Sequence, residues 1–398
     1  MSGSAFTARS DTPDWIADYS INLHVDPGEV ADDWRRLEGE RGATVYQSLR
    51  WNSACLNNVG RAHHISPLIV TCHTGDGRCD ALLALGLRKI GPFRVLCWLS
   101  EDVSSYGGGL FAPHLRARLA ENGFHDFWQA IVAQLPPFDV ALLRNIPADW
   151  QGTASPFLDL PCQRAANSGY VIDLDDDFEK LYRRKRSART RTRDRRKERQ
   201  LAALPDFALE RVTDPDRMSV MLAVLARQKN KDLATRFGVK GPFTPEVIAF
   251  LEDLARPAGS ATSPLVLHAL SADGEVLATS LGAVHNTVFY GISMSLSDGP
   301  HRKWSPGAYA LRVVIRDCIA NGLRALDLGP GTALYKTAWH DTKVDLFHII
   351  APQTFWGRPA ATVARVYVTL KRWIKNSPRL WTLFTMVRRW RPLIHFDR

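Results

Sequence analysis

The most informative stretch of this chain is Arg302-Lys303-Trp304-Ser305-Pro306-Gly307, followed by Ala308-Tyr309-Ala310-Leu311. It has the composition of a basic loop that opens a helix: a serine at the N-cap, a proline at the first helical position and a glycine after it. The first N–H groups of a helix beside two cationic side chains can bind an anion. The plain alternative is an ordinary well-capped helix.

The segments on both sides of this loop predict a strand–loop–helix–strand unit. Alternating apolar residues, with turns at Asp273-Gly274 and His285-Asn286, predict an antiparallel three-strand meander before the loop. Asn321-Gly322 has the residues that commonly end a helix. The expected elements are strands at 265–270, 275–284 and 287–294, a helix at 307–320 and a strand at 324–328.

The first half of the chain repeats this order more weakly. The expected elements are strands at 67–72, 81–87 and 93–99, a helix at 114–134 and a strand at 138–143. The sequence therefore predicts an α/β fold of two similar halves, each with a mixed, mostly antiparallel sheet flanked by helices. A length of 398 residues also suits two domains.

Composition limits the classes of protein to consider. The chain is 45% hydrophobic and 23% charged, as in a folded globular protein. Residues 1–14 lack the apolar core of a secretory signal, and no apolar run reaches the roughly 18 residues that span a bilayer. We expect a cytoplasmic protein, with peripheral contact to the inner membrane as an open alternative.

Cysteine and histidine spacing does not predict a metal site. The six cysteines form no CxxC pair, and adjacent side chains such as His63 and His64 point in different directions. Reduced cysteines in core positions are the simpler interpretation, and we expect no metal.

The net charge of +10 is concentrated in two elements. Residues 183–199 carry eleven Lys/Arg against two acidic residues, and residues 365–398 carry nine against one, so the rest of the chain is acidic. The first run is interpreted as a solvated helix face or as a contact to a polyanion such as tRNA or an acyl carrier protein. It has no DNA-reading motif, and no DNA partner is expected.

The C-terminal run is amphipathic as well as basic. Apolar residues recur at helical spacing among the cations, at Val363, Val366, Tyr367, Leu370, Trp373 and Ile374. This pattern is typical of an interfacial helix, or of a terminal helix packed on the body of the protein.

Three groups of residues carry a resemblance to a known family. They are Ser305-Pro306-Gly307, Leu326-Asp327-Leu328-Gly329, and Tyr335-Lys336 with Trp339; Tyr46-Gln47-Ser48 with Trp51 matches near the front. Together they resemble the GNAT acyltransferase superfamily, and more narrowly the CelD/BcsL-type acetyltransferases, which are relatives of the Fem aminoacyl transferases. One departure is that Ser305 stands where the common GNAT phosphate loop has its middle glycine.

The resemblance implies a domain plan. The expected parts are a flexible N-terminus (1–30), an N-terminal GNAT-like half (31–150), a connection with the basic helix (151–206), a C-terminal acyltransferase half (207–350) and a basic amphipathic tail (351–398).

The resemblance also implies a site and an activity. Acyl transfer from a thioester needs a base, an oxyanion donor and an acid for the leaving thiolate. We assign catalytic roles to Asp327, Tyr335 and Lys336, and binding of acetyl-CoA or another acyl-CoA to Arg302, Lys303, Ser305 and Gly307. Purely structural roles stay open for the catalytic three, and Asp298 is a weaker candidate base. The expected reaction is N- or O-acylation of a sugar, polysaccharide precursor or small metabolite. Fem-like transfer from aminoacyl-tRNA and a non-catalytic scaffold in an envelope or polysaccharide biosynthesis complex are the alternatives.

Overall fold

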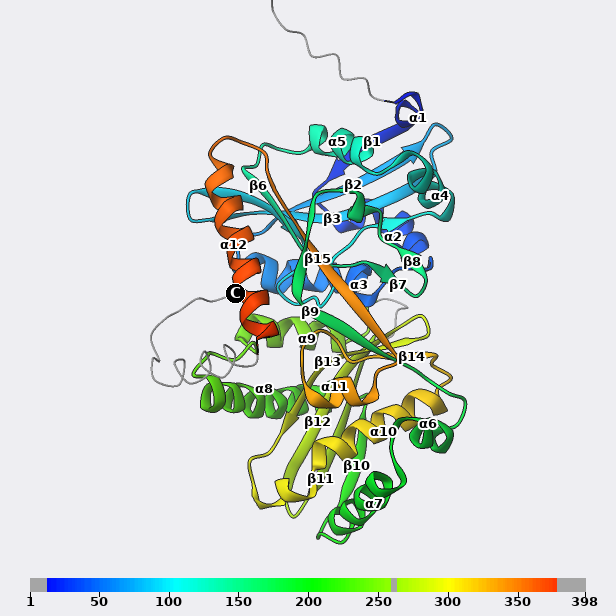
Figure 1. The fold of residues 1–398 in the computed structure, drawn as a ribbon, viewed down its shortest axis with the longest axis vertical. Coiled ribbons are helices and arrows are strands. Elements are labelled where there is room, and N and C mark those ends of the chain that lie inside the picture. Colours follow the sequence, from blue (N-terminus) through cyan, green and yellow to red (C-terminus); the bar gives the residue numbers. More distant parts are fainter. Residues whose placement is uncertain (1–12, 259–262, 378–398) are drawn as a thin grey trace, which may run out of the picture.

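The computed structural model describes residues 13–258 and 263–377 and contains one continuous mixed sheet through both halves of the chain (Figure 1). The strand order is β1-β2-β3-β4-β6-β15-β9-β14-β13-β12-β11-β10, and β5 pairs with β3. The strands of this sheet are β1 Tyr19–His24, β2 Ser66–Thr74, β3 Cys79–Ile90, β4 Phe93–Trp98, β5 Leu110–Phe111, β6 Val140–Pro147, β9 Cys162–Asp173, β10 Ala208–Val212, β11 Leu265–Ala272, β12 Glu275–His285, β13 Val288–Leu296, β14 Ala325–Asp327 and β15 Thr342–Pro352.

Helices flank the sheet, and a separate small hairpin is formed by β7 (Asp149–Trp150) and β8 (Thr153–Ala154). The α-helices are α1 Asp14–Ala17, α2 Ala31–Glu38, α3 Leu49–Cys55, α4 Pro113–Asn122, α5 His125–Gln134, α6 Phe178–Lys185, α7 Ala188–Ala202, α8 Pro215–Phe237, α9 Pro245–Ala255, α10 Pro306–Ala320, α11 Leu334–Trp339 and α12 Gly357–Asn376. Among the described residues, no helix combines the length and the apolar character needed to cross a membrane.

The two halves repeat one pattern, as the sequence predicts. Each has three antiparallel strands, β2–β3–β4 or β11–β12–β13, whose last strand then pairs briefly in parallel with a later strand. Both Asp273 and Gly274 have positive φ (54° and 69°), as the predicted two-residue hairpin turn requires.

The strand pairing at the centre of the sheet differs from the predicted domain plan. Residues 162–173 of the expected connection form β9, a long strand between β14 and β15. β15 in turn pairs with β6 of the first half, so the end of the second half completes the sheet of the first. The periodicity of these strands is interrupted by register shifts, at Asp345/Phe347 for example, which obscures them in the sequence.

Two further predictions were wrong in detail. The first 30 residues are not all flexible: β1 pairs with β2 over six residues, and Trp15 stacks on Phe127 with ring centroids 5.7 Å apart. Burial of these aromatic groups at the sheet edge fixes the segment. The expected helix at 114–134 is two helices, because Gly123 between them has a φ of 81°, which α-helical geometry excludes.

A buried aromatic cluster joins the halves. Tyr46 and Tyr106 from the first half pack with Trp150 and with Tyr290 of β13, and ring centroids in contact lie 5.2–5.7 Å apart. Each of these rings is less than 5% exposed. Desolvation of this much aromatic surface fixes the relative position of the halves, and the site described next lies beside this junction.

Candidate active site

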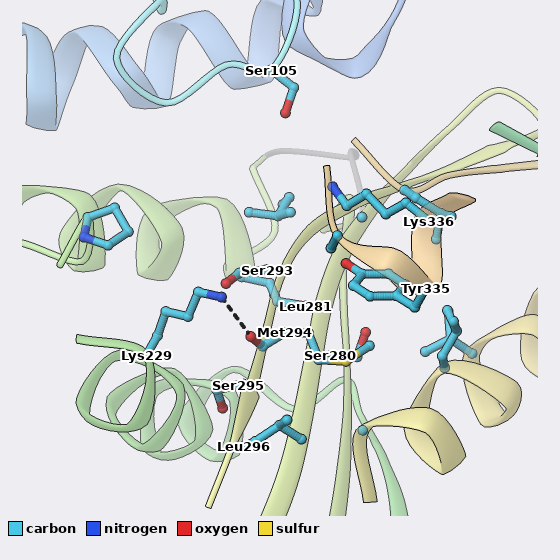
Figure 2. A pocket seen from close by; sticks show the side chains of 18 of the residues that line it. Ser105, Lys229, Ser280, Leu281, Ser293, Met294, Ser295, Leu296, Tyr335 and Lys336 are labelled. Atoms are coloured by element: carbon cyan, nitrogen blue, oxygen red, sulfur yellow. Dashed lines mark hydrogen bonds between the residues drawn. The ribbon is translucent and has the colours of Figure 1, made fainter. Parts of the chain in front are cut away.

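A cavity of about 940 Å³ lies beside the strand β13, between the halves. Its walls come from β12, β13, α8, α9, the N-terminal end of α10, α11 and the loop at 102–105 of the first half. Figure 2 shows Lys229, Ser293, Tyr335 and Lys336 around this space, with Ser105 facing it from the other half. A ligand in this cavity would therefore contact both halves of the chain.

The floor of the cavity is an open strand edge. β13 pairs with β14 only over Val288–Tyr290. Beyond that point β14 ends, whereas β13 continues to Leu296 and stays paired with β12. The register against β12 also jumps between Leu281↔Ser293 and Gly282↔Gly291, which makes Ile292 a bulge. Bulges twist a strand and interrupt its ladder, and an open edge offers backbone N–H and C=O groups to an extended ligand.

The beginning of α10 closes one end of this edge. Ser305 stands at the predicted N-cap but has left-handed φ and ψ (57° and 55°), and its side chain makes no capping hydrogen bond. Its backbone carbonyl accepts from Ala308 and Tyr309 instead. The hydroxyl oxygen of Ser305 accepts a 2.7 Å hydrogen bond from Nζ of Lys197 on α7. The loop is thus strained, and a lysine that the motif did not predict is bound to it.

The predicted phosphate-binding residues divide into two groups. Arg302, Ser305 and Gly307 line the cavity, whereas Lys303 does not: its ammonium lies over the ring of Trp304, 4.7 Å from the centroid. Arg302 is held by the carbonyl of Ser297 at 3.3 Å. Adjacent side chains of the short helix at 300–304 point in different directions, which explains why only one of the two cations faces the cavity.

Gly307 is required by a close approach rather than by backbone conformation. A Cβ at this position would lie 2.7 Å from Cδ2 of Leu296 on β13. The absent side chain therefore lets the first turn of α10 sit against the end of the open strand. Since Pro306 has no N–H, Gly307 is the first helical residue that offers one.

Tyr335 and Lys336 lie together on α11 and line the cavity. The phenol of Tyr335 points into it, and partial burial raises the pKa of this group (Figure 2). Nζ of Lys336 donates to the carbonyls of Gly329 at 3.1 Å and Pro330 at 2.8 Å. Burial lowers the pKa of Lys336 to about 8, which brings its neutral form into the physiological range.

Asp327 does not occupy the position predicted for a base. It is fully buried and outside the cavity wall. Its Oδ1 accepts from the hydroxyl of Tyr106 at 2.8 Å and from the N–H of Gly329 at 2.9 Å, and burial raises its pKa to about 6. Asp327 therefore ties the loop after β14 to the first half of the chain, which is the structural role that its sequence position left open.

The weaker candidates also take structural positions. Asp298 is exposed and forms a 2.8 Å ion pair with Lys231, away from the cavity wall. Trp339 lines the wall with one edge but is 4% exposed and stacks on Tyr182 at an interplanar angle of 3°. Packing is thus its main role.

Several cavity residues carried no signal in the sequence. Lys229 on α8 donates to the carbonyl of Met294 at 3.3 Å, and burial lowers its pKa (Figure 2). Arg312 on α10 is 3% exposed and is held by Glu198 at 2.7 Å and Asp194 at 3.4 Å of α7. These residues lie in ordinary helices, and only the packing of α7 and α8 brings them to the cavity.

One cluster of metal-binding side-chain types lies elsewhere. Asp33, His73 and Cys79 offer ligand atoms within 4.8 Å of one another, although their sequence spacing indicates no site. The guanidinium of Arg36 lies 3.6 Å from Asp33 and donates to the carbonyl of Cys79. This cation already balances the carboxylate, so we assign the cluster no function.

A match to a protein-family model covers much of the part of the chain that forms this cavity. Residues 188–337 match the family model described as Acetyltransferase (GNAT) domain, so the chain contains a domain of this class. The match begins at α7, includes α10 and ends within α11. It thus takes in the basic helix that the predicted domain plan assigned to the connection. No curated protein sequence matched.

Solved structures show the same fold over most of the chain. FemX is 11% identical, with a TM-score of 0.54, and the alignment covers 87% of this chain and 100% of FemX. A conserved protein of unknown function from Bacteroides thetaiotaomicron is 12% identical, with a TM-score of 0.50, over 83% and 99% of the two chains. A tandem GNAT protein from the clavulanic acid biosynthesis pathway is 13% identical, with a TM-score of 0.46, over 84% and 98%. FemX and the Bacteroides protein therefore share the fold of this chain, a mixed α/β fold with a large, mostly antiparallel sheet flanked by helices, while the narrower CelD/BcsL resemblance stays a prediction.

Proposed function

We propose that this protein is an acyl-CoA-dependent N- or O-acyltransferase that acts on a sugar, a polysaccharide precursor or a small metabolite. The observation that carries the proposal is the open edge of β13, which runs from the bulge at Ile292 to the beginning of α10. One cavity contains this edge, the guanidinium of Arg302 before α10 and the side chains of Tyr335 and Lys336. The GNAT match over these residues supports the reaction class.

An acyl-CoA fits this arrangement by its chemistry. Its pyrophosphate needs cations and backbone N–H groups, which Arg302 and Gly307 offer at one end of the cavity, while Lys197 is hydrogen-bonded to Ser305 of the same wall. Its pantetheine amides can pair with the open edge of β13 as an added strand does. The thioester would then lie near the bulge at Ile292, where backbone N–H groups can polarise its carbonyl.

The catalytic residues follow from the same placement. Transfer forms a C–N or C–O bond to the acceptor, breaks the thioester C–S bond and moves one proton from the acceptor to the departing thiolate. Neutral Lys336 has two N–H bonds, which the carbonyls of Gly329 and Pro330 can accept, so its lone pair stays available as a base. Tyr335 is the matching acid for the thiolate. Asp327 is not the base in this proposal, because its buried carboxylate does not reach the cavity wall.

A thiol-release assay tests this function. Acetyl-CoA and longer acyl-CoAs are incubated with a panel of amino sugars, polyols and small amines, and free CoA and acylated product are measured by colorimetry and mass spectrometry. Release should depend on both acceptor and enzyme, and Tyr335→Phe should lower kcat about 10- to 100-fold. Absence of acylated product from every acyl-CoA and acceptor would count against the proposal.

A specific observation favours a second candidate, Fem-like transfer from aminoacyl-tRNA. Helix α7 presents exposed arginines, among them Arg189, Arg193 and Arg196, and it contacts the α10 loop through Lys197. Salt-dependent tRNA binding that is lost when Arg189, Arg191 and Arg193 become Ala would favour this candidate. If the protein binds neither tRNA nor acyl-CoA, the non-catalytic scaffold would be the remaining candidate.

A further inference from the structure

Helix α12 has two apolar faces, and only one of them packs against other described residues. Ala361 is 1% exposed and lies with Ala364 and Val368 against Ile350 of β15 and Val140 of β6. The guanidinium of Arg365 donates to the carbonyl of Ile350 at 2.6 Å, and Gln163 of β9 donates to Thr369 at 2.7 Å. These contacts fix the helix on the sheet and so determine which residues face outward.

The outward face of α12 is an exposed apolar stripe. It consists of Val363 (69% exposed), Val366 (59%), Tyr367 (45%), Leu370 (49%) and Trp373 (61%). Their spacing of three and four residues places them in one line along the helix. The preceding turn adds Phe355 and Trp356, at 72% and 75%. Seven of the thirteen large exposed hydrophobic side chains among the described residues thus lie within residues 355–373, so the stripe is a concentrated patch.

The charge around this stripe has one sign. Residues 357–376 contain five Lys/Arg and no Asp or Glu. The guanidinium of Arg358 lies 5.5 Å from the ring centroid of Phe355, and Nζ of Lys371 lies 5.5 Å from that of Tyr367. Arg372 is also exposed, but at 3.6 residues per turn it lies on the side of the helix away from the stripe. Arg358 and Lys371 are therefore the cations that flank the apolar side chains.

We propose that α12 is a docking surface for an anionic lipid bilayer, with Val363, Val366, Tyr367, Leu370 and Trp373 inserted between headgroups and Arg358 and Lys371 bound to lipid phosphates. An apolar stripe with Trp and Tyr beside Lys and Arg matches the interface of such a bilayer. A second copy of α12 matches it poorly, because two helices with five cations each repel one another. This inference is independent of the proposed acyl transfer.

Vesicle flotation of the full chain tests the docking surface. The protein is mixed with vesicles of phosphatidylcholine alone or with 30% phosphatidylglycerol, at low and high salt. We expect flotation with the anionic vesicles only, weakened by salt. Trp373→Asp with Leu370→Asp should reduce the floated fraction at least about tenfold, since it places charge in the inserted stripe.

Matched variants make the outcome specific. Val220→Asp changes an apolar residue of α8 with similar exposure (53%) and should float as the unchanged protein does. Arg358→Glu with Lys371→Glu should lose binding to anionic vesicles. Thermal unfolding of each variant checks that the fold is retained.

Three results would overturn the proposal. One is equal flotation of the stripe variants and Val220→Asp. Another is full binding by the stripe variants but none by a chain ending at residue 377, which would assign the contact to residues 378–398. The third is a dimer in light scattering that the stripe variants dissociate, with no vesicle binding by the unchanged protein.

Discussion

Lys197 of the basic helix α7 donates a 2.7 Å hydrogen bond to the hydroxyl of Ser305, the residue immediately before α10. The basic run and the phosphate-type loop, predicted as separate features, therefore belong to one site. Ser305, which departs from the glycine of the common loop, gains a partner that a glycine could not have. Its side chain thus holds the ammonium of Lys197 next to a residue of the cavity wall.

This relationship predicts the effect of removing the cation. Lys197→Met should weaken acyl-CoA binding about 5- to 10-fold, because a charged hydrogen-bond donor is worth about 1.5–3 kcal/mol and this one is partly exposed. Calorimetric Kd values for the variant and the unchanged protein give the comparison. Arg189→Met, which removes an exposed cation of the same helix, is the control. Equal weakening by both variants would mean that Lys197 contributes only through the overall positive charge of α7.

Replacing Asp327 separates a structural role from a catalytic one. Asp327→Asn keeps an oxygen for Tyr106 and Gly329 and removes a buried negative charge. Because burial raises the pKa of Asp327 to about 6, the ionised carboxylate at pH 7.5 costs stability. The Asn variant should therefore be at least as stable as the unchanged protein at pH 7.5 and should keep its kcat.

Asp327→Ala supplies the contrast. It leaves the Tyr106 hydroxyl without its partner and should lower the free energy of unfolding by about 1–3 kcal/mol, measured by denaturant titration. A loss of kcat of a hundredfold or more in the Asn variant, with its stability intact, would restore Asp327 as the base.

The lowered pKa of Lys336 predicts a pH profile. With a pKa of about 8, the amine is neutral above that pH and protonated below it. If neutral Lys336 is the base, kcat should rise as the pH increases through about 8 and then level off. Lys336→Met should lower kcat about 10²- to 10⁴-fold and remove this rise. A profile with the same midpoint in the Met variant would assign the titration to another group.

The sequence predicted local features well and long-range ones poorly. The α10 loop, the meander and the pair Tyr335-Lys336 are contiguous, so their residues could be found by pattern. Lys229 reaches the cavity, and Lys197 reaches Ser305, only through helix packing, which leaves no spacing to detect. The buried position of Asp327 could not be predicted either, because its hydrogen-bond partner Tyr106 is 221 residues away in the sequence.

The central claim is that the cavity binds an acyl-CoA, and isothermal titration with acetyl-CoA and longer acyl-CoAs tests it most directly. We expect saturable binding at one site per chain. Arg302→Ala, which removes a cation from the cavity wall, should weaken it about tenfold, since a charge-assisted phosphate contact is lost. Lys303→Ala should leave it unchanged, because that ammonium lies over Trp304. Absence of binding for every acyl-CoA, or equal loss in the two neighbouring variants, would contradict the account.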